Sequence, residues 1–192
     1  NGGFADLYVV FAKVDGEHFT AFLVERSFPG VSTGQEEHKM GLHGSSTTPI
    51  VLQDARVPAD NVLGEVGKGH KVAPNTLNFG RFKLGGMSVG GCRAAIAASA
   101  AYAVARKQFG HSIASFGAIR HKVGEMTART YAIESLVYRR GGLIDATLHG
   151  SGASNGAAVA QAFEEYAVEA SIAKVGGTET LDYVLDENVQ IH

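Results

Sequence analysis

The sequence predicts an α+β fold, in which a β-rich part is followed by an all-helical part. Up to about Leu63, short runs of β-branched and aromatic residues alternate with turn-forming residues, a pattern typical of strands. From about Lys71 onward, apolar residues recur every three or four positions, which is typical of amphipathic helices. Strands grouped before helices indicate an α+β fold or two adjoining domains.

Three strands are expected in the β-rich part. Residues 7–11 and 19–24 are β-rich runs, and Asp15-Gly16 between them is a strong turn signal, so we expect a hairpin. Residues 30–34 are expected to form a loop, and residues 49–52 a third strand.

The first expected helix runs from about Asn78 to Lys107 and is rich in small residues. An interior glycine costs about 0.5–1 kcal/mol relative to alanine. Such a helix is therefore expected only where something packs very close to its backbone. That neighbour is either another helix or a flat ligand, and a helix is the more common choice. The small residues are Gly85, Gly86, Ser88, Gly90, Gly91, Ala94 and Ala95.

Two further helices are expected from apolar faces whose residues are spaced by three or four. A Gly/Ser-rich link at residues 148–155 separates them. The first face comprises Ile119, Val123, Met126, Thr130, Ile133 and Val137, and the second comprises Phe163, Tyr166, Ala170, Ala173, Gly177, Leu181 and Val184.

Composition argues against several classes of protein and site. The formal net charge is −2, so no global field favours nucleic acid or an anionic membrane surface. No apolar run is expected to reach membrane-spanning length, because glycine, lysine or arginine interrupts each one; membrane association is left open. Cys92, the only cysteine, lies among small apolar residues, which predicts inert packing. The eight histidines are scattered, and His38 and His43 do not sit at a ligand spacing with a third partner, so no metal site is expected.

Signals for phosphate loops and nucleophilic catalysis are weak. The segment Gly64-Glu65-Val66-Gly67-Lys68-Gly69 superficially resembles a phosphate loop, but it lacks the Gly-Lys-Ser/Thr ending. We therefore expect a turn between domains there. The Gly-x-Ser-x-Gly pattern occurs at residues 30–34, 86–90 and 152–156, but none of the three lies at an expected turn from a strand into a helix.

The strongest candidate site is the segment Arg106-Lys107-Gln108-Phe109-Gly110. A helix is expected to end at Gly110, and the helix dipole favours cations in a last turn by roughly 0.3–1 kcal/mol, so a capped helix end is one interpretation. The other is a dinucleotide contact. The planar fork of Arg106 suits a pyrophosphate, Gln108 adds neutral donors, and Phe109 can cover an aromatic ring system.

Five segments, in order, resemble the acyl-CoA dehydrogenase family over essentially the whole chain. Residues 1–6 resemble the tail of the family's Trp-Ile-(Thr/Ser)-Asn-Gly motif, and residues 39–47, Lys-Met-Gly-Leu-His-Gly-Ser-Ser-Thr, resemble its Lys-Met-Gly segment. Residues 57–64 are similar to the end of its β domain. Residues 106–119 are similar to its helix junction, and residues 190–192 to the start of its Gln-(Ile)-x-Gly-Gly-x-Gly segment.

The resemblance implies the domain organisation and the cofactor. Residues 1–64 would be the C-terminal part of an antiparallel β domain, and residues 65–192 an incomplete up-down helical bundle. The chain would be an internal fragment lacking both ends; a processed or trimmed polypeptide is the alternative. FAD is the implied cofactor, bound by a neighbouring subunit of a homodimer or dimer of dimers. The implied FAD contacts in this chain are Arg106, Gln108, Phe109, Phe116 and Gln190.

Within the family, the segment Leu77-Asn78-Phe79-Gly80-Arg81-Phe82 is most similar to the very-long-chain branch. This similarity implies that Asn78 and Arg81 line the acyl-CoA site, although Arg81 is equally interpreted as an ordinary arginine at a helix start. Gly80 stands where the isovaleryl branch carries its catalytic glutamate. The resemblance therefore implies that the base is a glutamate of a Glu-Gly-Thr segment beyond His192, and that this chain contains none.

The implied reaction is the α,β-dehydrogenation of a long-chain fatty acyl-CoA thioester in β-oxidation. A carboxylate removes the α-proton while hydride leaves the β-carbon for the flavin. The implied electron acceptor is electron-transfer flavoprotein, and the implied compartment is the bacterial cytoplasm or the mitochondrial matrix. Two alternatives stay open: an acyl-CoA oxidase of the same fold, and a non-catalytic assembly scaffold. The isolated chain is expected to bind little FAD and to be inactive.

Overall fold

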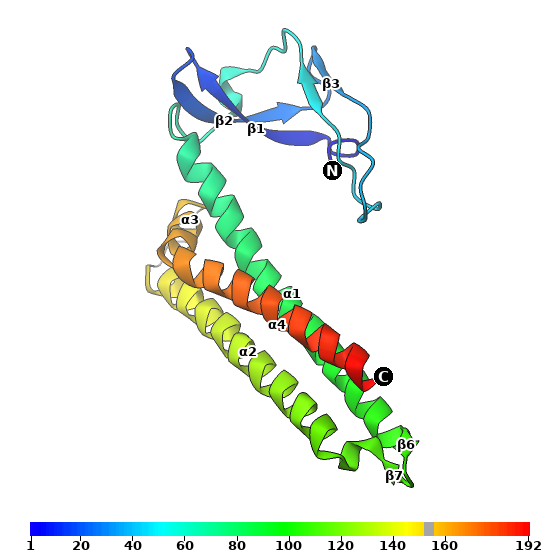
Figure 1. Ribbon diagram of the computed structural model, residues 1–192. Helices are drawn as coiled ribbons and strands as arrows, with labels where there is room; N and C mark the ends of the chain where they lie inside the picture. Colours follow the sequence, from blue (N-terminus) through cyan, green and yellow to red (C-terminus); the bar gives the residue numbers. More distant parts are fainter. Residues whose placement is uncertain (152–155) are drawn as a thin grey trace. The chain divides into compact units, whose positions relative to one another are not determined.

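The computed structural model describes residues 1–151 and 156–192, and Figure 1 shows the order of their elements. The chain divides into two compact units, Asn1–Pro74 and Asn75–His192. Antiparallel strands make up the first unit, and the second is dominated by helices. The α+β class predicted from the sequence is confirmed.

The first unit contains a three-stranded antiparallel sheet in the order β1-β2-β5. Strands β1 (Leu7–Val14) and β2 (His18–Glu25) form the expected hairpin, and β5 (Val62–Leu63) pairs with β2. The turn is tight because Asp15 and Gly16 both have positive φ, 52° and 76°. The rest of the unit includes the 3-10 turn η1 (Ala59–Asn61).

A second, two-stranded sheet corrects one expectation. Residues 31–33, expected to lie in a loop, form β3 (Val31–Thr33), which pairs with β4 (Ile50–Leu52). The Val-Ser-Thr sequence is too short to show a period, so only its distant pairing partner identifies it as a strand.

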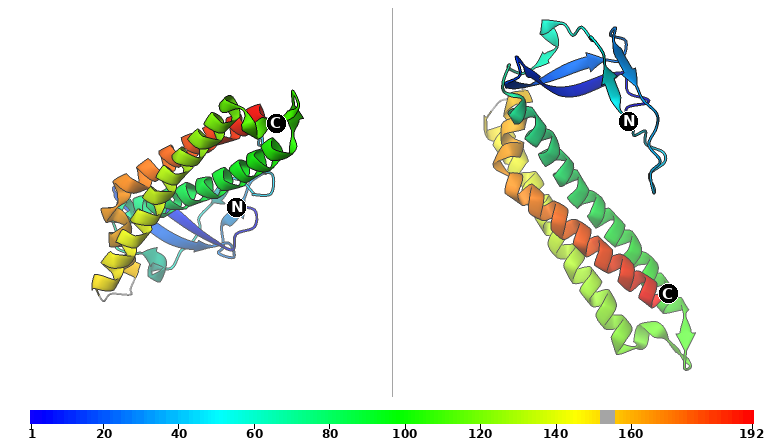
Figure 2. Two further views of the ribbon diagram at one scale, coloured as in Figure 1. Left: turned by 90° about the horizontal axis from the view of Figure 1, so that it is seen from below. Right: turned by 45° about the horizontal axis from the view of Figure 1, so that its top comes forward.

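Four helices form the helical part: α1 (Gly69–Ala105), α2 (Gly117–Ser151), α3 (Gly156–Glu165) and α4 (Ala167–Ile191). In both views of Figure 2, α1, α2 and α4 run alongside one another in alternating directions. A short hairpin of β6 (Lys107–Gln108) and β7 (His111–Ser112) follows α1, and the 3-10 turn η2 (Ile113–Ser115) leads into α2.

Helix boundaries differ from expectation in three places. Helix α1 begins at Gly69 rather than near Asn78, and Pro74 lies within its second turn. Residues 148–151, expected in a link, continue α2, and the rest of that link lies outside the described residues. The third expected helix is divided at Tyr166, whose φ of −103° and ψ of 33° separate α3 from α4.

The two expected helix faces are confirmed. Met126 and Thr130 of α2 are buried, and so are Ala170, Ala173 and Val184 of α3–α4. Met126 and Val184 belong to one core cluster, whose other buried members are Cys92, Ala95, Ala103, Ile113 and Ile191.

Glycines allow α1 to pack closely against another helix, as expected from the small residues in its sequence. A Cβ added at Gly85 would lie 3.2 Å from the carbonyl oxygen of Ala173, and one added at Gly177 would lie 3.3 Å from the Cα of Gly85. The close neighbour is therefore helix α4. Other glycines of α1 are different, because no described atom lies within 4 Å of a Cβ built at Gly86 or Gly90.

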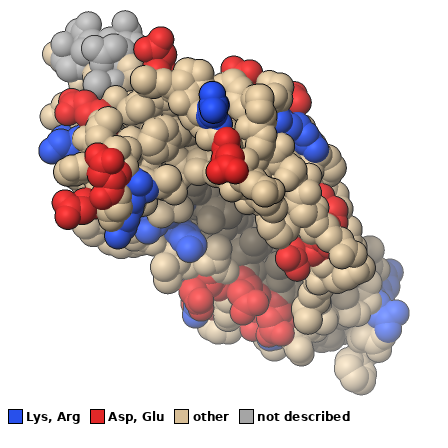
Figure 3. All heavy atoms as spheres, turned by 90° about the horizontal axis from the view of Figure 1, so that it is seen from above, with Lys and Arg blue, Asp and Glu red and all other residues tan. Residues whose placement is uncertain are grey.

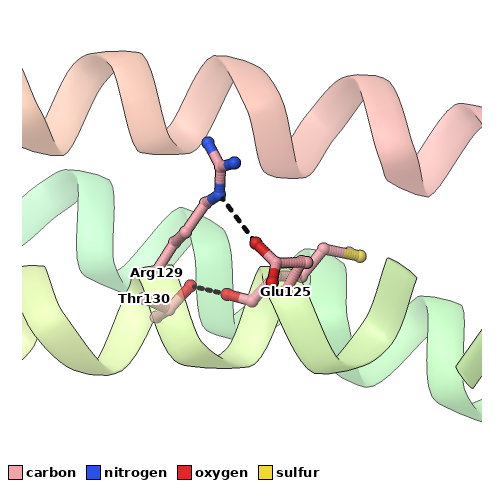
Figure 4. Close-up of polar contacts among 4 residues, drawn as sticks. Glu125, Arg129 and Thr130 are labelled. Carbon is pink, nitrogen blue, oxygen red and sulfur yellow. Dashed lines mark hydrogen bonds and ion pairs between the residues drawn. The ribbon is translucent and has the colours of Figure 1, made fainter. Parts of the chain in front are cut away.

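Polar contacts connect α2 to α4 along their length. Figure 4 shows Arg129 extending from α2 towards α4, where its guanidinium lies 3.9 Å from the ring centroid of Tyr183. Arg129 also pairs with Glu125, 3.4 Å away, while Thr130 donates to the Met126 carbonyl at 2.7 Å. Lys122 of α2 forms an ion pair with Glu187 of α4. On the surface seen in Figure 3, positive and negative side chains are interspersed, consistent with the small net charge.

Helix α1 also corrects the expectation about apolar length. An 18-residue window of α1 has a mean hydropathy of 1.2, so by length and composition alone this helix could cross a membrane. The interrupting residues are mostly glycines, which lower hydropathy little. Helices inside bundles pass the same test, and α1 lies alongside α2 and α4. However, only a third of that window is buried, so much of α1 is apolar and uncovered.

Candidate functional site

The candidate segment at residues 106–110 forms a β-hairpin that projects from the end of α1. Lys107 pairs with Ser112 and Gln108 with His111, so Phe109 and Gly110 make the turn. Both have positive φ, 51° and 81°, which is the geometry of a two-residue hairpin turn. The turn places Phe109 at the tip, where its side chain is 90% exposed.

This geometry overturns the expected helix end. Helix α1 stops at Ala105, and it has no basic residue in its last turn. The helix end expected at Gly110 is therefore wrong: Arg106 directly follows the helix, and its N–H still donates to the Tyr102 carbonyl at 2.8 Å. Gly110 serves the hairpin turn, because glycine adopts positive φ without strain.

Ser112 fixes the hairpin to the helix end. Its hydroxyl donates to the carbonyls of Ala103 and Val104, 2.8 and 3.1 Å away, and accepts from the N–H of Ala114 at 3.3 Å. The N–H of Ile113 also donates to the Arg106 carbonyl at 2.9 Å. These hydrogen bonds anchor the hairpin to the end of α1, so its side chains project from an ordered backbone.

The end of α4 lies beside the end of α1. The Tyr102 hydroxyl donates to the His192 carbonyl at 3.1 Å, and the two rings are stacked with centroids 4.4 Å apart. The Ser99 hydroxyl donates to Asn188 Oδ1 at 2.6 Å. These contacts bring Gln190, which is exposed, to the same end of the helical unit as the hairpin.

The five residues predicted to bind the cofactor thus gather at one end of the unit. The rings of Phe109 and Phe116 lie edge to face with centroids 6.4 Å apart. Arg106, Gln108 and Gln190 are exposed, and their side chains form no hydrogen bond or ion pair within the described part of the chain. A cation, two amides and the exposed Phe109 ring are therefore free to bind a molecule that arrives from outside, whereas Phe116 is half-buried and packs against the core.

An apolar groove of about 660 Å³ adjoins the hairpin, between α1 and α2. Ala103 and Val104 from α1 and Ile119 and Val123 from α2 contribute to its walls, with Arg120 at the same site. Val104 is two-thirds exposed, so the groove is open. Contiguous open apolar surface of this kind commonly marks a contact with another protein surface.

The two residues predicted to bind substrate also lie together, in the first half of α1. Arg81 Nη1 donates to Asn78 Oδ1 at 2.9 Å, and Asn78 is only 3% exposed. Asn78 thus accepts from Arg81 on the inner side of the helix, while Arg81 is half-buried. Gly80 lies between them, and no described atom is within 4 Å of a Cβ built there.

Cysteine and metal chemistry have no visible site. Cys92 is buried, and burial raises the pKa of its thiol, which fits the expected inert packing. Within residues 1–151 and 156–192, no group of three or more His, Cys, Asp or Glu residues is arranged to hold a metal ion.

Sequence reasoning missed the residues that support the site. Ser112 and Tyr102, which fix the hairpin and the end of α4, were not singled out. Ser112 carries a local signal, because serine is a preferred residue immediately before a helical turn and here precedes η2. Tyr102 has no such signal, since its partner His192 is distant in sequence.

Comparison with known proteins finds one family for the chain. Residues 67–192 match the model of the acyl-CoA dehydrogenase C-terminal domain. The whole chain is 51% identical to a probable acyl-CoA dehydrogenase of Bacillus subtilis and covers 33% of that protein. It is 40% identical to the mitochondrial very long-chain specific acyl-CoA dehydrogenase of Rattus norvegicus, of which it covers 28%.

Solved structures agree with this placement. An acyl-CoA dehydrogenase from Bacillus anthracis, complexed with FAD, matches the whole chain with a TM-score of 0.89 and 51% identity, and the chain covers 33% of it. Butyryl-CoA dehydrogenase from Megasphaera elsdenii matches with a TM-score of 0.80 and 38% identity, over 47% of its chain. The chain thus spans between about a quarter and a half of these relatives. The chain belongs to the acyl-CoA dehydrogenase family.

Proposed function

We propose that this chain is part of an FAD-dependent acyl-CoA dehydrogenase that forms the α,β double bond of long-chain fatty acyl-CoA thioesters in β-oxidation. Family membership supports the reaction class. The proposed chain length rests on the segment Leu77–Phe82, because the identities to a very long-chain and a short-chain specific enzyme, 40% and 38%, do not separate the two. The two residue ranges 1–64 and 65–192 would be part of the middle β domain and an incomplete C-terminal helical domain.

The hairpin carries this proposal. Arg106 offers paired N–H donors to a pyrophosphate, and Gln108 and Gln190 offer amide donors. The rings of Phe109 and Phe116 offer apolar faces to a flat ring system. All five side chains belong to one end of the helical unit, and the chemistry of this set fits FAD. When bound, FAD would supply the hydride acceptor.

The flavin served by this hairpin belongs to a neighbouring protomer in our proposal. The hairpin projects beyond α1 into solvent, and the open apolar groove between α1 and α2 adjoins it. A second protomer seated on that groove would cover apolar surface and bring a bound dinucleotide to the tip. We therefore propose a homodimer or a dimer of dimers.

Substrate recognition is assigned to the first half of α1. Arg81 uses one of its five N–H donors on Asn78, so it keeps donors for the acyl-CoA. Asn78 orients that guanidinium from a buried position. Gly80 provides no ionisable group, and we place the base in a segment that follows His192 in the full-length protein.

The electron acceptor follows from the same proposal. We assign it to electron-transfer flavoprotein, in a bacterial cytoplasm or a mitochondrial matrix. Turnover of acyl-CoA by the full-length enzyme with this flavoprotein, and not with dioxygen, is expected. Fast turnover with dioxygen would instead identify an acyl-CoA oxidase, and no turnover with either acceptor would support a non-catalytic scaffold.

Retention of FAD by the full-length protein tests the role of the hairpin. Arg106→Ala should weaken FAD binding about tenfold or more, because it removes charge-assisted hydrogen bonds to the pyrophosphate. Lys107→Ala, which removes the same charge from the neighbouring position, is the matched control and should retain more flavin.

The measurement is flavin absorbance per protein after extended dialysis. Equal flavin occupancy in wild type and Arg106→Ala would contradict the proposed contact. The 192-residue chain alone should bind little FAD and show no dehydrogenase activity, so turnover of a long-chain acyl-CoA by this polypeptide would contradict the proposed location of the base.

A further inference from the structure

A buried arginine in the helical unit has no role in the proposed FAD contact. Arg140 of α2 is 1% exposed. Its Nη1 and Nη2 atoms are buried and find no hydrogen-bond partner among residues 1–151 and 156–192. Only Nε is bonded, donating to the Tyr166 carbonyl at 3.2 Å. Burial lowers the pKa of this guanidinium, and nearby Glu169 partly offsets that effect.

Aromatic rings surround the guanidinium instead of carboxylates. The Arg140 Cζ atom lies 4.5 Å from the ring centroid of Phe82 on α1 and 5.4 Å from that of Phe163 on α3. Phe163 also contacts the Phe79 ring edge to face, with centroids 5.4 Å apart. We call Arg140, Phe82 and Phe163 the arginine clasp, because it joins α1, α2 and α3.

The clasp is not an efficient way to gain stability. Desolvating a cation carries a large penalty, and the two cation–π contacts recover only part of it. A well-packed apolar side chain of similar size often stabilises the folded protein as much or more at a buried site. What the guanidinium adds is geometry, since its planar group packs against two rings that also contact each other edge to face, with centroids 6.4 Å apart.

The clasp lies next to the proposed substrate residues. Phe82 follows Asn78 by four residues, so both side chains project from the same face of α1. Asn78 in turn accepts from Arg81 at 2.9 Å. A shift of Phe82 would therefore move the turn of helix that carries Asn78 and Arg81.

We propose that Arg140 is a positioning residue for acyl-CoA binding, acting through Phe82 and Asn78 on Arg81. This inference rests on the proposed substrate role of Arg81. The guanidinium never touches the substrate; it fixes the rotation and register of the first half of α1 against α2 and α3.

The test uses the full-length enzyme and a non-reducible acyl-CoA thioether as the probe. Arg140→Met keeps the volume but loses the planar cation, and Arg139→Met, at an exposed neighbouring position, is the matched control. We expect Arg140→Met to weaken thioether binding about tenfold, with FAD content unchanged, because small displacements of binding groups have large effects. Arg139→Met should bind the thioether like wild type. Unchanged affinity in Arg140→Met, or equal losses in both variants, would overturn the proposal.

Arg81→Gln separates this inference from the proposed function. If Arg81→Gln leaves thioether affinity unchanged, the substrate role of Arg81 fails, and the inference fails with it. If Arg81→Gln weakens binding and Arg140→Met does not, the inference alone fails. When both weaken it, the double variant should bind no worse than Arg81→Gln, because the two residues act through one contact; additive losses would show that Arg140 acts independently.

A folding defect is controlled by a second variant. If Arg140→Met does not accumulate as a folded protein, Phe163→Leu removes one wall of the clasp and keeps the guanidinium. It should also weaken thioether binding while FAD content stays at the wild-type level. Wild-type affinity in Phe163→Leu would overturn the proposal.

Discussion

Two arginines towards opposite ends of the helical unit show how differently one residue type is used. Arg106 follows α1 at the hairpin end, is exposed, and has no side-chain partner among the described residues. Arg140 packs against Phe163 of α3, which lies at the other end in Figure 2, and is almost completely buried. The first guanidinium is free for a molecule from outside, whereas the second is committed to neighbours inside the chain.

The contrast separates binding from packing. An exposed side chain with no partner contributes little to stability, so its loss should be visible only in binding. A buried side chain that packs against two rings contributes to the arrangement of the helices, so its loss should be visible in the isolated chain. Substitution of Arg106 is therefore expected to affect binding, and substitution of Arg140 is expected to affect stability.

The largest expected effect on folding is at the buried end. Arg140→Ala should lower the free energy of unfolding of the 192-residue chain by about 2–4 kcal/mol, because alanine leaves a cavity between Phe82 and Phe163. Arg106→Ala should change it by less than about 0.5 kcal/mol. Urea unfolding followed by far-UV circular dichroism measures both. Equal losses of unfolding free energy in the two variants would contradict the assignment of Arg140 to packing and of Arg106 to binding.

Two adjacent glycines of α1 show the same contrast between a packed and an exposed position, with smaller expected effects on stability. Gly85→Ala should destabilise the chain by about 1–3 kcal/mol, because its methyl group would meet the Ala173 carbonyl of α4 at 3.2 Å. Gly86→Ala, the adjacent position, should stabilise it by about 0.5–1 kcal/mol, because the site is open and alanine is the better helix former. Thermal unfolding of the two variants and the wild type measures both changes in stability. A stabilising Gly85→Ala would contradict the close crossing of α1 and α4.

A smaller effect is expected where the hairpin is fixed. Ser112→Ala removes the hydroxyl that binds the carbonyls of Ala103 and Val104, which should cost about 1 kcal/mol locally. Faster hydrogen exchange of the hairpin amides is the readout, and the amides of α4 serve as the internal control. Unchanged exchange in the hairpin would show that the other contacts, such as that of Ile113 with Arg106, are sufficient to hold it.

The fold class and the core faces were predictable because they depend on local periodicity. The faces that contain Met126 and Ala173 repeat every three or four residues, and both are buried. The hidden strand at Val31–Thr33 and the break at Tyr166 were not predictable in this way. Each depends on a contact that is distant in sequence, with Ile50–Leu52 in the first case and with Arg140 in the second.

The residues of the candidate site were proposed from the sequence, and their role stays a prediction; their geometry could not be predicted. Arg106, Gln108 and Phe109 were identified by their chemistry, yet the sequence favoured a helix end where the structure has a hairpin. The hairpin was missed because it is short, and its polar strands lack the alternation that marks longer ones. Arg140 was missed altogether, because its aromatic neighbours come from helices far apart in sequence.

Proximity of the hairpin tip to a bound flavin is the most direct test of the proposed role. Phe109→Trp in the full-length protein places a fluorophore at the tip, and Tyr138→Trp places one at an exposed position of α2 outside the proposed site. Addition of FAD to the two apoproteins should strongly quench the emission from position 109 and quench that from position 138 much less. Equal quenching at both positions, or none at position 109, would contradict the assignment of this hairpin to the flavin.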